Sequence, residues 1–303
     1  MDSIVKIEHH FERNEIKDEF RIWTQLARPS LVIPENVVGI CEYGFTEILN
    51  NVIDHSDSNN VIIRVNQDES ETKFEIEDDG VGLFSNLCSY FNFDNEIHAL
   101  IELVKGKLTV APQAHSGEGL FFSSKVFDQF EIESGGLLVT FKADDCLVKS
   151  IKPRKGTLIR MQISNDSKAT SKEIFDKFCD KEEYTFDKTR FFVSLAVLEG
   201  SLISRSQAKR VAARFESFSE VELNFSGVDS IGQAFADELI RVWPLNHPQT
   251  KLQLTNTSNA VLQMINHIKG RRDLPQPISD ETNNGDGDGF GGGAAGGPPP
   301  RLR

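Results

Sequence analysis

The sequence predicts an α+β protein with two folded units and a tail. In the first half, predicted helices and antiparallel strands occur in separate groups, which favours an α/β sandwich over a doubly wound parallel sheet. In residues 190–268, strands and helices alternate, which favours a small α/β layer with parallel strand pairing. From Gly270 the chain is rich in glycine and proline and cannot bury a core, so we expect a disordered tail.

Four segments are therefore expected along the 303 residues. They are an N-terminal unit (1–168), a polar linker (169–183), a second small unit (184–269) and the Gly/Pro-rich tail (270–303). A hydrophobic content of 39% is sufficient for a core of ordinary size.

The charge and cysteine content exclude several classes of partner and site. The net charge of -13 makes nucleic acid a poor partner, because an acidic chain is repelled by phosphate backbones. The four cysteines are too widely spaced for a zinc knuckle or a disulfide framework. The first ten residues do not resemble a signal peptide, and no apolar run approaches membrane-spanning length. We therefore expect a cytoplasmic protein without membrane contact.

Periodicity predicts the elements of the first half. Apolar residues at helical spacing predict helices at 15–27, 35–55, 94–105 and 119–127. Alternation of apolar and polar residues predicts strands at 60–66, 72–77, 129–134, 137–142 and 157–163. We expect Gly135 and Gly136 to form a two-residue hairpin turn between two of these strands.

The second half is read in the same way. One helix, 171–178, is expected within the linker. In the second unit we expect strands at 190–196, 220–225 and 251–255, and helices at 204–215, 233–243 and 257–268.

The helix predicted at 35–55 carries the first candidate site. Glu47, Asn51 and His55 are spaced by four residues and therefore share one face. An Asn carbonyl is a suitable ligand for Mg²⁺, and a carboxylate one turn away can orient or deprotonate a water molecule. Considered alone, these residues are better explained as an ordinary polar helix face with an incidental Glu and Asn.

Two glycine-containing motifs follow. Asp78, Gly80 and Gly82 come directly after a predicted strand, where a buried carboxylate can accept a hydrogen bond from an adenine amino group. Gly117 and Gly119 lie at a predicted helix start, where backbone N–H groups favour phosphate oxygens. The alternatives are an ordinary acidic turn and a glycine-rich helix entry. Together with the helical motif, however, they describe a pocket for ATP and Mg²⁺.

These three motifs, in this order, resemble those of the GHKL ATPase superfamily, which includes DNA gyrase B subunits and sensor histidine kinases. The match assigns Glu47 and Asn51 to the N box, Asp78, Gly80 and Gly82 to the adenine motif, and Gly117 and Gly119 to the second glycine motif. Thr157 after Gly156 resembles the threonine that supports adenine. The resemblance covers roughly residues 4–163 and implies a Bergerat fold, ATP with Mg²⁺, and a mobile lid between Gly82 and Gly117.

Within the superfamily, His55 and Ser116 look most like residues of the anti-sigma-factor serine kinases. That resemblance implies catalytic roles for Glu47 and His55, a metal-ligand role for Asn51, and ATP binding by Ser116 with the residues of the two glycine motifs and Thr157. A sensor histidine kinase needs an upstream helical unit with a phosphoacceptor histidine. His9 and His10 lie in a segment too short for one.

Residues 222–238 resemble the core of a STAS domain, and the second half is similar to STAS-like domains of unassigned function fused to such ATPases. STAS proteins carry a phosphorylatable serine at a helix start. Here that segment aligns with residues 232–235, which contain no serine, and Ser230 lies upstream. A structural or partner-binding role for this domain is therefore favoured.

Three functions remain open from sequence. The first is an ATP-binding regulatory protein whose GHKL domain binds and hydrolyses Mg-ATP to control interaction through the STAS-like domain. The second is an anti-sigma-type serine/threonine protein kinase acting on a separate partner. The third is a non-catalytic nucleotide-sensing adaptor. Each requires an unidentified protein partner, and a homodimer is a further expectation because GHKL proteins often dimerise.

Overall fold

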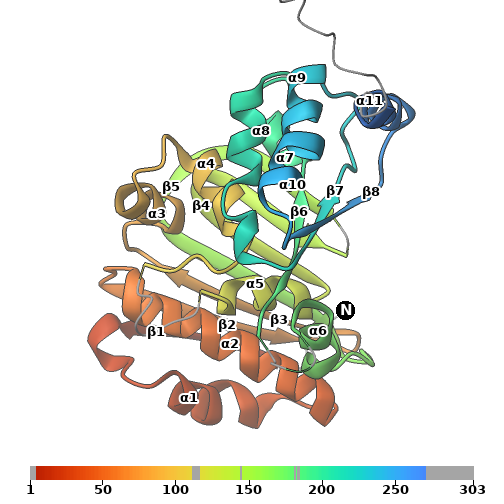
Figure 1. The fold of residues 1–303 in the computed structure, drawn as a ribbon. Coiled ribbons are helices and arrows are strands. Elements are labelled where there is room, and N and C mark those ends of the chain that lie inside the picture. The colour runs from red at the N-terminus through yellow and green to blue at the C-terminus, as the bar shows by residue number, and fades with distance from the viewer. Residues whose placement is uncertain (1–4, 111–116, 144, 181, 183–184, 271–303) are drawn as a thin grey trace, which may run out of the picture.

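The computed structural model describes residues 5–110, 117–143, 145–180, 182 and 185–270. Within these residues the chain forms two sheets, one five-stranded in the order β1-β2-β3-β5-β4 and one three-stranded in the order β6-β7-β8 (Figure 1). The predicted mixed α+β class is confirmed. The predicted disordered tail lies outside the described residues.

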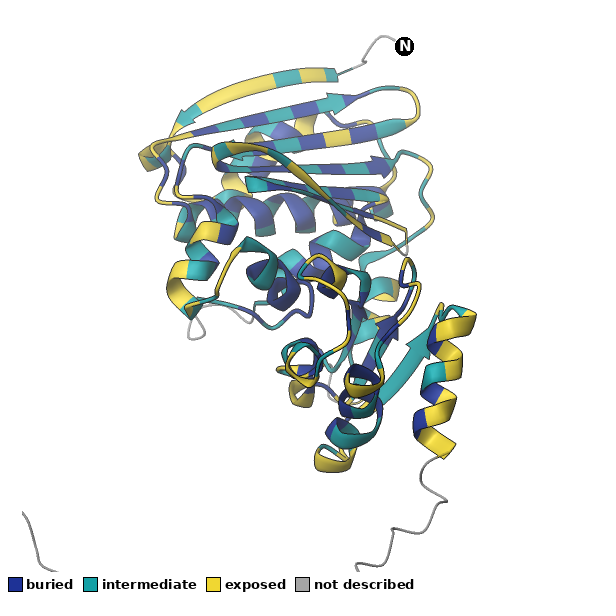
Figure 2. Ribbon diagram, turned by 90° about the horizontal axis from the view of Figure 1, so that it is seen from above, coloured by how far each residue is buried: buried dark blue, intermediate teal, exposed yellow. Residues whose placement is uncertain are grey.

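All neighbouring strands of the five-stranded sheet are antiparallel. The strands are β1 Val5–Glu12, β2 Asn60–Gln67, β3 Glu71–Asp78, β4 Gln129–Lys142 and β5 Asp145–Ser164. Buried and more exposed residues alternate along β2 and β3, because successive side chains point to opposite faces (Figure 2). The buried face supports the helices and the core.

In the described residues up to Phe178, the chain forms six α-helices. They are α1 Glu19–Ile22, α2 Glu35–His55, α3 Leu83–Phe91, α4 Glu96–Leu103, α5 Gly119–Val126 and α6 Ser171–Phe178. The longest, α2, begins directly after Pro34 and contacts β3 and β5 through a buried apolar stripe. This packing fixes the rotation of α2 and therefore the direction of the polar residues beside the stripe.

Several sequence predictions for this half are wrong in detail. The helix predicted from Glu15 begins only at Glu19, because the Asp18 carboxylate accepts the backbone N–H of Arg21 and caps the helix there. Gly135 and Gly136 do not form a hairpin turn. They form an irregularity within the continuous strand β4, and the Gly136 N–H donates to Glu96 Oε2 at 3.0 Å. Strand β1 and helix α3 were not predicted.

The second unit is built on three parallel strands, as predicted. The strands are β6 Lys188–Phe192, β7 Glu220–Asn224 and β8 Lys251–Thr255, with helices α7 Ser194–Val197, α8 Arg205–Ala212, α9 Gln233–Ala236, α10 Trp243–Asn246 and α11 Asn259–Gly270. A π-helical segment, η5 (Asp237–Val242), continues α9. The strand predicted to end at Ala196 instead ends at Phe192, and the short helix α7 follows it.

Phenylalanines join the two units. Phe186 lies 4.6 Å from Phe121 of α5 and 5.3 Å from Phe218, measured between ring centroids. Helix α6, expected within a linker, packs on the first unit through Phe175, whose ring lies 4.3 Å from that of Phe122. The buried apolar residues of both units therefore form one continuous core.

Candidate functional site

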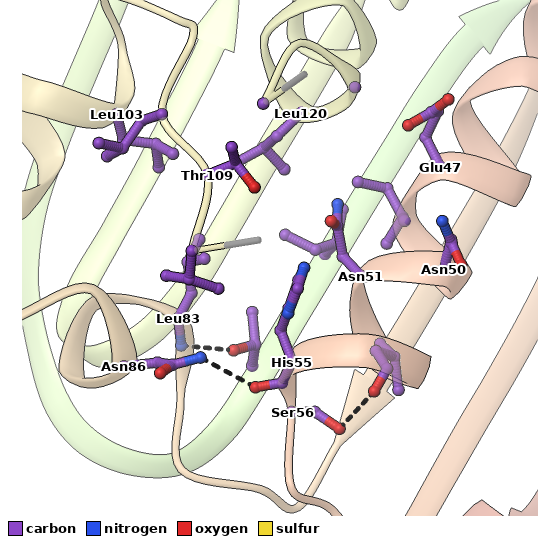
Figure 3. Close-up of a pocket in the computed structure, with 18 of the residues that line it drawn as sticks. Glu47, Asn50, Asn51, His55, Ser56, Leu83, Asn86, Leu103, Thr109 and Leu120 are labelled. Atoms are coloured by element: carbon purple, nitrogen blue, oxygen red, sulfur yellow. Dashed lines mark hydrogen bonds between the residues drawn. The ribbon is translucent and has the colours of Figure 1, made fainter. Parts of the chain in front are cut away.

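A cavity of about 440 Å³ lies between α2, the sheet and the segment that leads into α5 (Figure 3). This volume is within the range of small-molecule sites. Eight of the predicted site residues line it, namely Glu47, Asn51, His55, Asp78, Gly82, Gly117, Gly119 and Thr157. Gly80 does not line it, and Ser116 lies outside the described residues.

Helix α2 forms one wall of the cavity. Glu47, Asn51 and His55 line it at successive turns, as their spacing predicted (Figure 3). Tyr43, one turn before Glu47, also lines it. Burial, with the nearby Glu47 and Glu118 carboxylates, raises the pKa of the Tyr43 hydroxyl. The four-residue spacing could have extended the predicted motif back to Tyr43.

Asp78 projects into the cavity from the end of β3. The inward-facing residues of this strand are Thr72, Phe74, Ile76 and Asp78, so the strand alternation turns this carboxylate inward. Only 5% of Asp78 is exposed, and Oδ1 accepts the N–H of Gly80 at 2.8 Å. Burial raises the pKa of Asp78 to about 6, although backbone N–H groups of Gly80 and Thr157 oppose this shift.

The adjacent carboxylate, Asp79, has a structural role instead. Its Oδ1 accepts the backbone N–H groups of Asn59 and Asn60, at 2.8 and 2.9 Å. These hydrogen bonds, together with one from the Asn60 side chain, hold the pKa of Asp79 below its ordinary value. Asp79 thus ties the loop after β3 to the start of β2, and only Asp78 lines the cavity.

Gly80 positions this loop without facing the cavity. A Cβ atom at Gly80 would overlap the backbone carbonyl of Ser56, just beyond α2. The next residue, Val81, donates its N–H to that same carbonyl at 3.0 Å. The absence of a side chain at Gly80 therefore allows the loop that carries Asp78 to lie against the end of α2.

Thr157, on β5, connects this strand to α3. Its Oγ1 accepts the backbone N–H of Leu83 at 2.9 Å, which fixes the first residue of that helix. Gly156 has a φ of +72°, and a Cβ atom there would overlap the Asp78 carbonyl. Glycine at this position lets Thr157 lie beside Asp78.

Gly117 and Gly119 lie at the entry to α5, opposite Glu47. Gly117 has a φ of +71°, and a Cβ atom there would be 2.6 Å from the carbonyl carbon of Leu108. A Cβ atom at Gly119 would overlap Glu47 Oε2. The two glycines therefore leave backbone, not side chains, facing the Glu47 end of the cavity.

Other residues of the cavity were missed by the sequence analysis. Asn86 of α3 lines it and donates through Nδ2 to the His55 carbonyl at 2.9 Å (Figure 3). Thr109, Glu118 and Phe175 line it as well. No sequence signal identified Asn86, because α3 itself was not predicted.

The chemical character of the cavity changes between its two ends. Near Asp78 the wall includes Ile76 and Ile159, which are register partners on β3 and β5. Near Glu47 the lining combines polar groups, with Asn51 and the glycine backbone, and the aromatic rings of Tyr43 and Phe175. Among the described residues, no three His, Cys, Asp or Glu side chains are grouped so as to hold a metal ion. Asn51, the predicted metal ligand, and Glu47, the predicted catalytic carboxylate, both line the cavity.

Residues 207–262 match the model of a STAS-like domain of unknown function (DUF4325). The match begins within α8, includes β7 and β8, and ends within α11. No curated protein matches the chain. In the part of the chain that the structure describes, no helix has the length and apolar character needed to cross a membrane.

Proposed function

We propose that the N-terminal unit is a Bergerat-fold ATP-binding unit of the GHKL type, and that the protein is a regulator that acts through its STAS-like unit. One observation carries this proposal. Asp78 is a buried carboxylate on a cavity wall, it is held by backbone N–H groups, and no described cation forms an ion pair with it. Such a group has an unmet need for a hydrogen-bond donor from a ligand.

The Asp78 end of the cavity suits an adenine ring. Oδ1 is already engaged by Gly80, and the remaining acceptor capacity of the carboxylate is available to an exocyclic amino group. Ile76 and Ile159 provide apolar surface for the planar base. A base held this way directs the rest of a nucleotide along α2 toward Glu47.

The Glu47 end suits the phosphates. Gly117 and Gly119 present backbone without side chains at the entry to α5, where backbone N–H groups would bind phosphate oxygens. Asn51 would hold Mg²⁺ through its side-chain carbonyl, and the bound ion would neutralise charge on phosphate oxygens. Glu47, one turn away, would orient or deprotonate the water that attacks the terminal phosphate.

His55 supports a second candidate function. Its side chain lines the cavity on the same face of α2 as Glu47 and Asn51. This arrangement agrees with a serine/threonine kinase that transfers phosphate to another protein. Incubation with labelled ATP and cell lysate distinguishes the kinase from the ATP-hydrolysing regulator. If the protein is a kinase, the wild type produces phosphoserine and the Glu47→Gln variant does not.

Calorimetric titration with Mg-ATP tests the first proposal. We expect saturable binding by the wild type and a loss of at least about tenfold for Asp78→Asn, because the amide replaces an acceptor oxygen with a donor. Glu75→Gln is the matched control, since Glu75 lies on the same strand and faces the opposite side of the sheet. Absence of ATP binding by the wild type would overturn the proposal.

Turnover is tested separately. Glu47→Gln retains the size of the side chain but cannot accept a proton from water. We expect this variant to bind ATP with near wild-type affinity and to lose phosphate release. If phosphate release persisted in purified Glu47→Gln protein, Glu47 would not be the residue that activates water.

A further inference from the structure

The STAS-like unit holds one wall of the cavity. Leu103, at the end of α4, and Leu108, Thr109 and Val110, in the segment after it, line the cavity. Between them lies the turn 105–107, which contacts the second unit. The same short segment thus faces the ligand space on one side and the STAS-like unit on the other.

Lys105 binds the C-terminal end of α8. Its side chain is fully buried, and Nζ donates to the carbonyls of Ala213 at 2.9 Å and Arg210 at 3.3 Å. Glu102 Oε1 accepts from the same nitrogen at 2.6 Å. A cation among the last carbonyls of a helix satisfies acceptors that have no partner within that helix.

Arg214 makes the reciprocal contact. Its guanidinium donates to the carbonyls of Glu102, Gly106 and Lys107, at 3.2, 2.7 and 2.8 Å. It also donates to Glu102 Oε2 at 3.2 Å. Each unit therefore caps a helix end of the other. We call Glu102, Lys105 and Arg214 the reciprocal clamp.

Two further hydrogen bonds fix the same turn. Thr189 Oγ1 of β6 donates to the Lys105 carbonyl at 2.7 Å, and Lys107 Nζ donates to the Ser217 carbonyl at 2.8 Å. A buried charge deprived of its partners is strongly unfavourable. The reciprocal clamp is therefore expected to form or separate as a whole and not to loosen gradually.

The residue that follows the turn, Leu108, is in contact with one glycine of the cavity. Gly117 approaches the Leu108 backbone so closely that a Cβ atom could not be accommodated. A Cβ atom at Gly119 would overlap the Glu47 carboxylate on the other side of the cavity. A ligand that orders these glycines consequently orders Leu108, which follows Lys107 directly in the chain.

We propose that the reciprocal clamp couples ligand binding in the cavity to docking of the STAS-like unit. In the docked state, the clamp holds the wall formed by residues 103–110 in its binding conformation. The coupling is reciprocal, so a bound nucleotide strengthens docking by the factor by which docking strengthens nucleotide binding. A protein that drew α8 away would release the nucleotide. This inference rests on the proposed ATP-binding function.

The test compares Mg-ATP affinities of full-length variants by calorimetry. Arg214→Ala removes the donors to the turn and is expected to weaken binding at least about fivefold, the lower range of typical coupling. Arg214→Lys retains the charge but not the forked set of donors, so its affinity for Mg-ATP should lie between those of the wild type and Arg214→Ala. The matched control is Arg241→Ala, because Arg241 belongs to the same unit and pairs with Asp237. Circular dichroism establishes that each variant is folded.

A second measurement needs no substitution. Hydrogen exchange of the wild type, with and without Mg-ATP, should show slower exchange in residues 205–217 of the STAS-like unit when nucleotide is present. These residues do not line the cavity, so protection there reports coupling and not direct contact.

The outcomes separate the two proposals. If the wild type binds ATP, Arg214→Ala binds equally well, and residues 205–217 are not protected, the coupling is overturned while the ATP-binding function stands. If the wild type does not bind ATP, the proposed function is overturned, and the coupling with it. Loss of affinity in Arg214→Ala, with normal binding by Arg241→Ala, supports both.

Discussion

The two faces of the five-stranded sheet shift the pKa of a carboxylate in opposite directions, as the adjacent residues Glu77 and Asp78 of β3 show. Glu77 faces outward and accepts from Arg154 at 2.6 Å and Arg64 at 2.9 Å. Partial burial raises its pKa, but the two guanidinium hydrogen bonds outweigh this and lower it overall. Asp78 faces inward, and burial raises its pKa to about 6.

The rest of the outer face repeats the pattern of Glu77. Arginines on β2 and β5 alternate with glutamates on β3 and β4 in a network that comprises Arg64, Arg154, Arg160, Glu75, Glu131 and Glu133. These charges pair with one another across neighbouring strands, although Arg154 Nε is buried without a hydrogen-bond partner. The comparison teaches that guanidinium partners keep an outer carboxylate readily ionised, whereas burial without an ion pair makes the inner carboxylate the better candidate for a ligand contact.

The largest expected effect that tests this difference between the two faces is on the free energy of unfolding. The folded pKa of Asp78, about 6, lies above the ordinary value of 3.8, so its stabilising contribution is complete below pH 3.8 and is lost as the pH rises through 6. Asp78→Asn carries no charge. We expect it to raise the free energy of unfolding by up to about 3 kcal/mol at pH 8, with the difference disappearing near pH 4.

Urea unfolding at both pH values measures this difference. Glu75→Gln, on the outer face of the same strand, serves as the control. Equal stability of Asp78→Asn and the wild type at pH 8 would mean that the inner carboxylate is as well compensated as the outer ones.

A smaller effect concerns ligand binding. Only the ionised form of Asp78 is a full acceptor, so affinity for the base should fall about tenfold between pH 8 and pH 5, as expected for a pKa of about 6. Adenosine is the suitable probe, because it has no phosphate that titrates in this range. Asp78→Asn should bind adenosine weakly at both pH values. A constant affinity in the wild type would contradict the assigned role.

The smallest expected effect is that of replacing Glu77, the carboxylate on the outer face. Glu77→Gln should lower the free energy of unfolding by about 0.5–1 kcal/mol at pH 7, the range of exposed ion pairs, and leave adenosine affinity unchanged. The folded pKa of Glu77 lies below 4.5, so its stabilisation is present above pH 4.5 and is lost as the pH falls through the lower folded value. Urea unfolding at pH 7 checks the first statement and titration with adenosine checks the second.

Much of the cavity could be predicted from local sequence. The four-residue spacing along α2 and the two-residue alternation along β3 each determine a facing direction, and both elements form where the sequence predicts them. These two periodicities are enough to predict the facing direction of the four side chains that line the cavity, Glu47, Asn51, His55 and Asp78, without knowledge of the whole fold.

The remaining features depend on contacts between distant residues. Strand β1 is mostly polar and forms an edge of the sheet, so its pattern is weak. Gly135 and Gly136 look like a turn, yet the neighbouring Glu96 accepts the Gly136 N–H and the strand continues past them. Lys105 and Arg214 are 109 positions apart in the numbering, and nothing in either local sequence indicates that they share Glu102.

The reciprocal clamp also limits how the protein could be rearranged by recombination. Each unit supplies a cation that binds the terminal carbonyls of a helix in the other unit. Neither unit alone therefore satisfies all of its own hydrogen-bond acceptors at this junction. An N-terminal half joined to a different partner domain would carry Lys105 without the α8 carbonyls and an α4 end without Arg214. A functional exchange would need to transfer the positions around residues 105 and 214 together, which makes this junction part of the specificity of the pair.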